Sequence, residues 1–182
     1  IELCQQILAS RDEDSFFGSN LSDSAISTAV ASVALEIADA EKYAEAVHSG
    51  KNWLLNHQNA DGLYGDSPES PANLTATFMS YVALSRDLCH VEKLARSKEY
   101  LLDHFGDFSF SSIRKGFLEE YGEDLTFSVP ILAMATAAGF FADIQSTWRR
   151  MPKFPFEVVV FPEKLFQYLN LPVVSYAIPA LI

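Results

Sequence analysis

The feature that most constrains this fold is an internal repeat with a period of about 47 residues. The segment Trp53-Leu54-Leu55-Asn56-His57 recurs 47 residues later as Tyr100-Leu101-Leu102-Asp103-His104, and Ile7-Leu8 aligns one period earlier. Self-similarity at this spacing is typical of stacked units that bury their apolar faces only against their neighbours. The pattern predicts three such units. They span about residues 1–40, 41–88 and 89–140.

Each unit is expected to consist of a helix, a turn and a second helix. Helices of the first type are amphipathic, as in the segment 43–54, where apolar residues recur at helical spacing among charged ones. Helices of the second type follow Ser24, Asn73 and Thr126 and carry small residues nearly all round. Ser24 and Asn73 are of the types that cap helix N-termini. An amphipathic outer ring around a small-residue inner ring predicts an all-α fold, a partial α/α toroid.

The chain is long enough, at 182 residues, for one domain, and its hydrophobic content of 49% argues against disorder. A Pro-rich and aromatic segment at 147–172 precedes a further expected helix at 173–182. Because the chain ends inside the apolar stretch Val173 to Ile182, we expect residues 1–182 to form a single domain of a longer protein.

Charge and composition argue against several classes of function. The net charge of −11 argues against nucleic acid as a partner, because phosphate contacts need clustered Lys and Arg. The four His and two Cys residues show no metal-ligand spacing, so we expect neither a bound metal nor another cofactor. Two cysteines without a secretion signal favour a cytoplasmic protein.

A short motif points to a known family. Its residues are Trp53, Gln58, Asp61, Gly62, Tyr64 and Gly65. An aromatic helix end, then Gln, then Asp-Gly-x-aromatic resembles the QW motif of squalene-hopene and oxidosqualene cyclases, with Tyr64 in place of the motif's Trp. The Pro-rich stretch from Trp148 to Leu181 resembles the segment that follows the third helical hairpin in bacterial triterpene cyclases. Similar repeats occur in protein prenyltransferase β-subunits and in bacterial prenyltransferase/squalene-oxidase-repeat proteins.

The resemblance implies an isomerase that cyclises a squalene-like polyprenyl hydrocarbon in triterpenoid biosynthesis. In that family a strong acid within Asp-x-Asp-Asp starts the reaction, and the motif lies in a second α/α domain. This chain has no Asp-x-Asp-Asp, so the resemblance implies a cavity wall that is inactive alone and needs the second domain as partner. No catalytic residue is assigned. The residues expected to line the cavity are Asn73, Thr77, Tyr81, Thr126, Phe127, Ser128 and Pro130.

A second expectation concerns the membrane. Phe154, Phe156, Phe161 and Phe166 stand in an apolar stretch beside Arg149, Arg150 and Lys153. Apolar residues flanked by cations are typical of peripheral anchors, since the cations favour lipid phosphates. One hypothesis is that this stretch contacts the inner membrane as a monotopic anchor, and the alternative is that the four Phe side chains pack against the missing domain.

Two other functions stay open. The same repeat suits a non-enzymatic module that binds prenyl lipids or a protein partner. It also suits a protein prenyltransferase-like β-subunit, which would carry zinc and pair with a second subunit.

Overall fold

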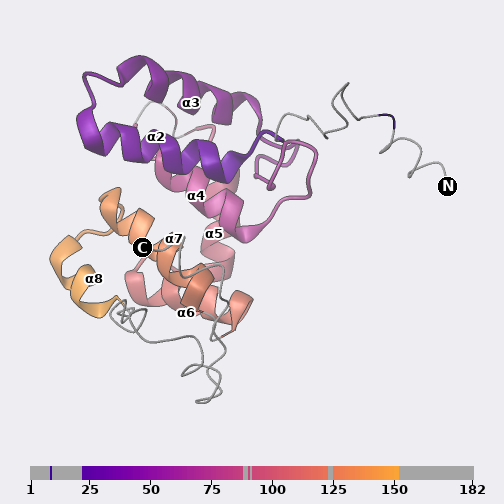
Figure 1. Cartoon of the computed structure of the whole chain (residues 1–182). Coiled ribbons are helices and arrows are strands. Elements are labelled where there is room, and N and C mark those ends of the chain that lie inside the picture. Colours follow the sequence, from indigo (N-terminus) through magenta and orange to yellow (C-terminus); the bar gives the residue numbers. More distant parts are fainter. Residues whose placement is uncertain (1–8, 10–21, 88–89, 91, 123–124, 152–182) are drawn as a thin grey trace.

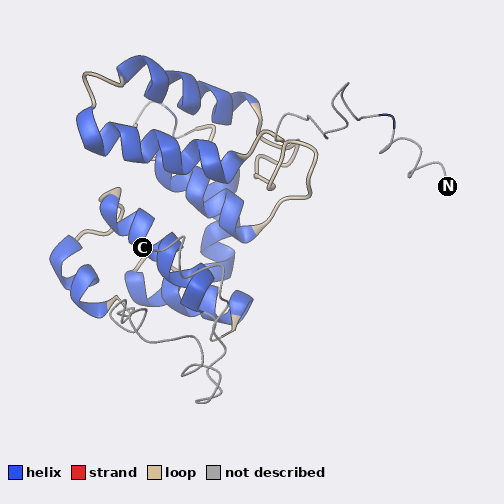
Figure 2. Cartoon of the chain, viewed as in Figure 1, coloured by secondary structure: helices blue, strands red, loops and turns tan. Residues whose placement is uncertain are grey.

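The fold is all-helical, as the sequence predicts, over the part of the chain that the computed structural model describes: Ala9 and residues 22–87, 90, 92–122 and 125–151 (Figures 1 and 2). These residues form seven named helices and no strand, and Gly65 and Ala72 make an isolated antiparallel bridge. The helices are α2 (Ala25–Asp39), α3 (Ala44–Asn56), α4 (Leu74–Leu84), α5 (Ala95–Phe105), α6 (Phe110–Tyr121), α7 (Leu125–Ala137) and α8 (Ile144–Arg150).

The predicted N-caps are confirmed. Ser24 precedes α2, and its hydroxyl accepts a hydrogen bond from the Ser27 amide at 3.2 Å. Asn73 precedes α4, and its side-chain oxygen accepts from the Ala76 amide at 2.8 Å. In each helix a side chain satisfies a backbone N–H that has no partner within the first turn.

Helix α4 lies at the centre of the described fold. It contacts α2, α3, α5 and α7, and every residue from Leu74 to Leu84 is buried. Figure 1 shows α2 and α3 side by side in front of and above α4, with α5 to α8 on its other side. A helix buried on all sides needs small or apolar residues around its whole circumference, which is the composition the sequence gives it.

An aromatic cluster connects α4 with the second half of the chain. The ring of Phe78 on α4 meets Phe105 of α5, Phe117 of α6 and Phe140 at centroid distances of 5.6, 5.3 and 5.6 Å. All three contacts are edge-to-face, the arrangement that aromatic quadrupoles favour.

The third unit departs from the expected helix, turn and helix. Helix α6 stands between α5 and α7, where only a turn was expected. Ser109 caps it by accepting from the Ser112 amide at 3.2 Å, and Phe110, Ile113 and Phe117 form its buried stripe. The spacing i, i+3, i+7 behind an N-cap residue was the sequence signal for this helix.

Candidate functional site

The motif turn from Asp61 to Gly65 is held by hydrogen bonds between side chains and its backbone groups. The Asp61 carboxylate accepts from the Leu63 amide at 3.1 Å, which closes a tight turn. Gly62 has a φ of 77°, and a Cβ there would lie 2.9 Å from Cβ of Arg96. The Gly62 carbonyl accepts from the buried Ser97 hydroxyl of α5 at 2.7 Å. Asp61 and Gly62 thus shape the turn and place it against α5.

Tyr64 fixes the turn to the start of α4. Its amide donates to Oγ1 of Thr77 at 3.2 Å, and its carbonyl accepts from the Thr77 hydroxyl at 3.2 Å and the Asn73 amide at 2.9 Å. The Tyr64 ring is fully buried, and its hydroxyl has no hydrogen-bond partner. Burial raises the pKa of Tyr64 far above the usual value, and the nearby Gln58 side chain opposes this only weakly.

Gln58 links two successive hairpins. It follows α3, and its amide nitrogen lies 3.3 Å from the carbonyl of Gly62 and 3.3 Å from that of Lys93, just before α5. One side chain therefore contacts the motif turn and the entrance to the next unit. This bridge gives the Gln of the motif a physical role.

The aromatic ends of α3 and α5 share one local geometry. Nδ1 of His57 lies 2.8 Å from the Trp53 carbonyl, and the two rings stack at 4.1 Å. Nδ1 of His104 lies 2.8 Å from the Tyr100 carbonyl, with ring centroids 4.3 Å apart. Both histidines thus act in helix-end packing, which accounts for their recurrence 47 residues apart.

The side chains of Asn73, Thr77 and Tyr81, which were expected to line a cavity, make hydrogen bonds or packing contacts within the fold. Asn73 caps the helix and also donates to Asp66 at 2.8 Å. Thr77 is fully buried against Tyr64. Tyr81 is 8% exposed and packs against Phe108 and Phe140 at 5.4 and 6.1 Å.

The expected cavity residues Thr126, Phe127, Ser128 and Pro130 all lie within α7. Phe127 is 57% exposed and stacks on Tyr121 at 5.5 Å, whereas Ser128 is buried. Pro130 stands inside the helix, where it removes one backbone hydrogen bond. The apolar residues that follow Pro130 continue the helix to Ala137.

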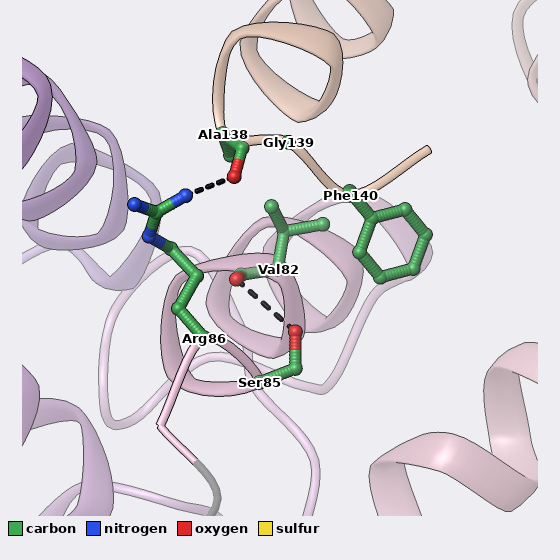
Figure 3. Close-up of a pocket in the computed structure, with 6 residues that line it drawn as sticks. All are labelled: Val82, Ser85, Arg86, Ala138, Gly139 and Phe140. Atoms are coloured by element: carbon green, nitrogen blue, oxygen red, sulfur yellow. Dashed lines mark hydrogen bonds between the residues drawn. The ribbon is translucent and has the colours of Figure 1, made fainter. Parts of the chain in front are cut away.

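A pocket of about 270 Å³ lies where the C-terminal ends of α4 and α7 meet, and none of the seven expected cavity residues lines it (Figure 3). Its lining residues are Val82, Ser85, Arg86, Ala138, Gly139 and Phe140. Figure 3 shows the Arg86 guanidinium on one side and the Phe140 ring on another, with the Ser85 hydroxyl directed at the Val82 carbonyl. The pocket thus combines a cation, carbonyl oxygens at two helix ends and an aromatic face.

Arg86 belongs to a charged cluster that the sequence analysis missed. Its Nε lies 3.1 Å from Glu36 of α2, and Nη1 donates to the Ala138 carbonyl. Lys51 of α3 has a side chain only 7% exposed and lies 3.0 Å from Glu36 and 2.9 Å from Asp87. A cation at the C-terminal ends of two helices is electrostatically favourable. The sequence signal was the position of Lys51 on the apolar stripe of α3.

A second recess lies on the surface beside the motif turn. It measures about 280 Å³ and is lined by Asp61, Leu63, Arg96, Glu99, Tyr100 and Asp103. Arg96 and Glu99 form an exposed ion pair at 2.7 Å. Burial, with smaller contributions from Glu120 and Asp61, raises the pKa of the Tyr100 phenol, so Tyr100 is a neutral hydrogen-bonding group there.

The expected membrane contact concerns residues that lie outside the described part of the chain. These are Phe154, Phe156, Phe161 and Phe166. Over the part that the structure covers, no helix has both the length and the apolar character needed to cross a bilayer. Within the same part, no group of three His, Cys, Asp or Glu side chains could hold a metal ion.

Comparison of the chain with protein-family models, curated proteins and solved structures finds no match.

Proposed function

We propose that this chain forms a wall of a squalene-hopene-cyclase-like enzyme that acts on a long polyprenyl hydrocarbon. In this proposal the helical hairpins continue into an α/α toroid, and a second α/α domain supplies the strong acid. The proposal rests on the family resemblance of the motif.

The observation that carries the proposal is the bridge made by Gln58. In the resembling family the motif is expected to fasten one hairpin to the next. Here Gln58 contacts the turn at Gly62 and the entrance to α5 at Lys93, both at 3.3 Å. A residue chosen on sequence grounds as structural thus joins two units that the repeat treats as neighbours.

The aromatic cluster suits the chemistry of carbocations. Cyclisation moves positive charge along the hydrocarbon, and aromatic faces stabilise cations by their quadrupoles. Tyr81, Phe108 and Phe140 pack together at the edge of the cluster, and Phe140 lines the pocket beside Arg86. We assign Tyr81 and Phe140 as the wall residues nearest to substrate.

The size of that pocket favours a second candidate, a non-enzymatic module that binds prenyl lipids. Its volume of about 270 Å³ falls below the range of roughly 300–1,000 Å³ typical of small-molecule sites. A chain of thirty-odd heavy atoms would lie against this surface and not inside it. Surface contact of this kind requires no catalytic acid.

The test is incubation of the full-length protein, in detergent or liposomes, with squalene and shorter polyprenes, followed by mass spectrometry. A cyclised isomer is expected, with the yield lowered at least tenfold by Tyr81→Ala. The control Tyr43→Ala removes an aromatic ring at the N-terminal end of α3 that is not part of the aromatic cluster, and it should leave the yield unchanged.

Saturable squalene binding without product would support the binding module instead. Neither product nor binding would overturn both candidates. Liposome flotation tests the membrane contact, which we also propose: Phe161→Glu with Phe166→Glu should release the protein from vesicles containing anionic lipid, whereas unchanged flotation would contradict it.

A further inference from the structure

Arg86 brings an unused hydrogen-bond donor to the pocket between α4 and α7 (Figure 3). Its Nη1 atom carries two N–H groups. One donates to the Ala138 carbonyl, and the other has no acceptor within the part of the chain that the structure describes. The same nitrogen stands at the pocket wall, since a Cβ on Gly139, which also lines the pocket, would lie 4.0 Å from it. Such a donor suits an oxygen atom of a bound molecule.

Ser85 supplies an acceptor in the same pocket. Its hydroxyl donates to the Val82 carbonyl at 3.2 Å, so the lone pairs of Oγ remain to accept a hydrogen bond. Ser85 and Arg86 both line the pocket, as Figure 3 shows. A donor and an acceptor together are the complement of a hydroxyl group, which both accepts and donates. A bound hydrocarbon would exclude water from both groups and leave them without a partner, which costs free energy.

The charges around the pocket favour a neutral group. Lys51 and Arg86 are balanced by Glu36 and Asp87, and His90, 4.0 Å from Asp87, adds charge only when it is protonated. The C-terminal ends of two helices add partial negative charge. A phosphate or carboxylate would therefore meet one cation that is already paired, together with the negative helix ends.

We propose that this pocket holds the hydroxyl end of a prenyl alcohol, with the hydroxyl accepting from Nη1 of Arg86 and donating to Oγ of Ser85. The inference rests on the prenyl-chain contact proposed above and narrows the class of lipid. A volume of about 270 Å³ suits the head of such a molecule and not its whole length. Phe140 lines the pocket and meets Phe108 at 5.6 Å, and both rings are partly buried, so the chain beyond the head lies across them.

Three probes of equal chain length test the class of lipid: farnesol, the hydrocarbon farnesene and farnesyl phosphate. Each is titrated into the full chain in dilute detergent, and calorimetry gives the dissociation constant. Two hydrogen bonds, one of them from a cation, should make farnesol bind about tenfold more tightly than farnesene. Farnesyl phosphate should bind more weakly than farnesol, because its charge is not compensated.

Two variants test the pocket itself. Arg86→Met keeps a long side chain without donors, so farnesol should bind about tenfold more weakly while farnesene binding stays unchanged. Ser85→Ala leaves the ion pair of Arg86 with Glu36 in place and should lower the preference for farnesol about threefold. Arg96→Met is the matched control, since Arg96 lies on α5 and does not line this pocket. Far-UV circular dichroism checks that all three variants stay helical.

Farnesene that binds as tightly as farnesol would overturn this inference and leave the proposed prenyl contact standing. Tighter binding of farnesyl phosphate would overturn it as well, because the head would then be charged. A preference for farnesol that survives in both Arg86→Met and Ser85→Ala would show that the alcohol binds elsewhere. A chain that binds none of the three probes would overturn the prenyl contact itself.

Discussion

Single residues of the motif turn act through backbone geometry. Gly62 and Gly106 have nearly the same φ, 77° and 79°, yet their surroundings differ. A Cβ on Gly62 would meet Arg96 at 2.9 Å, whereas a Cβ on Gly106 would have nothing within 4 Å. The two glycines therefore separate the cost of a positive φ from the cost of a steric clash.

We expect Gly106→Ala to lower the free energy of unfolding by about 1 kcal/mol, the conformational cost alone. Gly62→Ala should lower it by about 2–3 kcal/mol, because the clash with Arg96 adds to that cost. Urea denaturation of the two variants measures the difference. Equal losses would show that the turn moves away from α5 without penalty.

Tyr64 carries a buried hydroxyl without a hydrogen-bond partner. Tyr64→Phe removes it, so we expect stability at pH 7 to stay the same or to rise by up to about 1 kcal/mol. A loss above 1 kcal/mol would show that the hydroxyl is bonded, with Gln58 the nearest candidate.

The pH dependence of stability gives a second test of Tyr64. Burial raises the pKa of Tyr64 in the folded state above its unfolded value of about 10. The unfolded chain then loses a proton that the folded chain keeps, so stability falls as pH rises above about 10. Tyr64→Phe should make that fall shallower in thermal unfolding scans, and Tyr81→Phe, where burial also raises the pKa, should have a smaller effect.

Between elements, Gln58 joins the end of α3 to the start of α5. Gln58→Met keeps the length of the side chain but removes both hydrogen bonds, and we expect a loss of about 1–2 kcal/mol. Amide exchange should quicken in the first turn of α5 and stay unchanged in α2. Uniform quickening along the chain would show that Gln58 stabilises the whole fold and not this junction.

The helices themselves differ in how far the sequence predicts them. Helices α2 and α4 follow from a cap residue and a run of small and apolar residues, and both caps are confirmed. Helix α6 was missed because the repeat predicted only a turn between the two helices of the third unit. Helix α7 was expected to follow Thr126, and it begins at Leu125 and continues through Pro130.

For the molecule as a whole, Phe78 is the residue that joins the two halves. It touches Phe105, Phe117 and Phe140 from three different parts of the chain and is fully buried. Phe78→Ala should cost about 3–5 kcal/mol, a large share of the stability of a domain this size. The near-UV circular dichroism should weaken with it.

Phe127→Ala is the control for that loss, because Phe127 is 57% exposed and should change stability by less than about 0.5 kcal/mol. Similar losses in the two variants would show that the aromatic cluster does not hold the halves together.

The sequence by itself determined the helical class, the caps of α2 and α4 and the small-residue character of the central helix. These follow from local chemistry, since caps, turns and helical spacing depend on residues within a few positions. Only the tertiary structure decided that Lys51, Glu36, Asp87 and Arg86 meet. Such encounters join residues up to 52 positions apart, as Arg86 and Ala138 do, and depend on how helices pack, which local spacing does not encode.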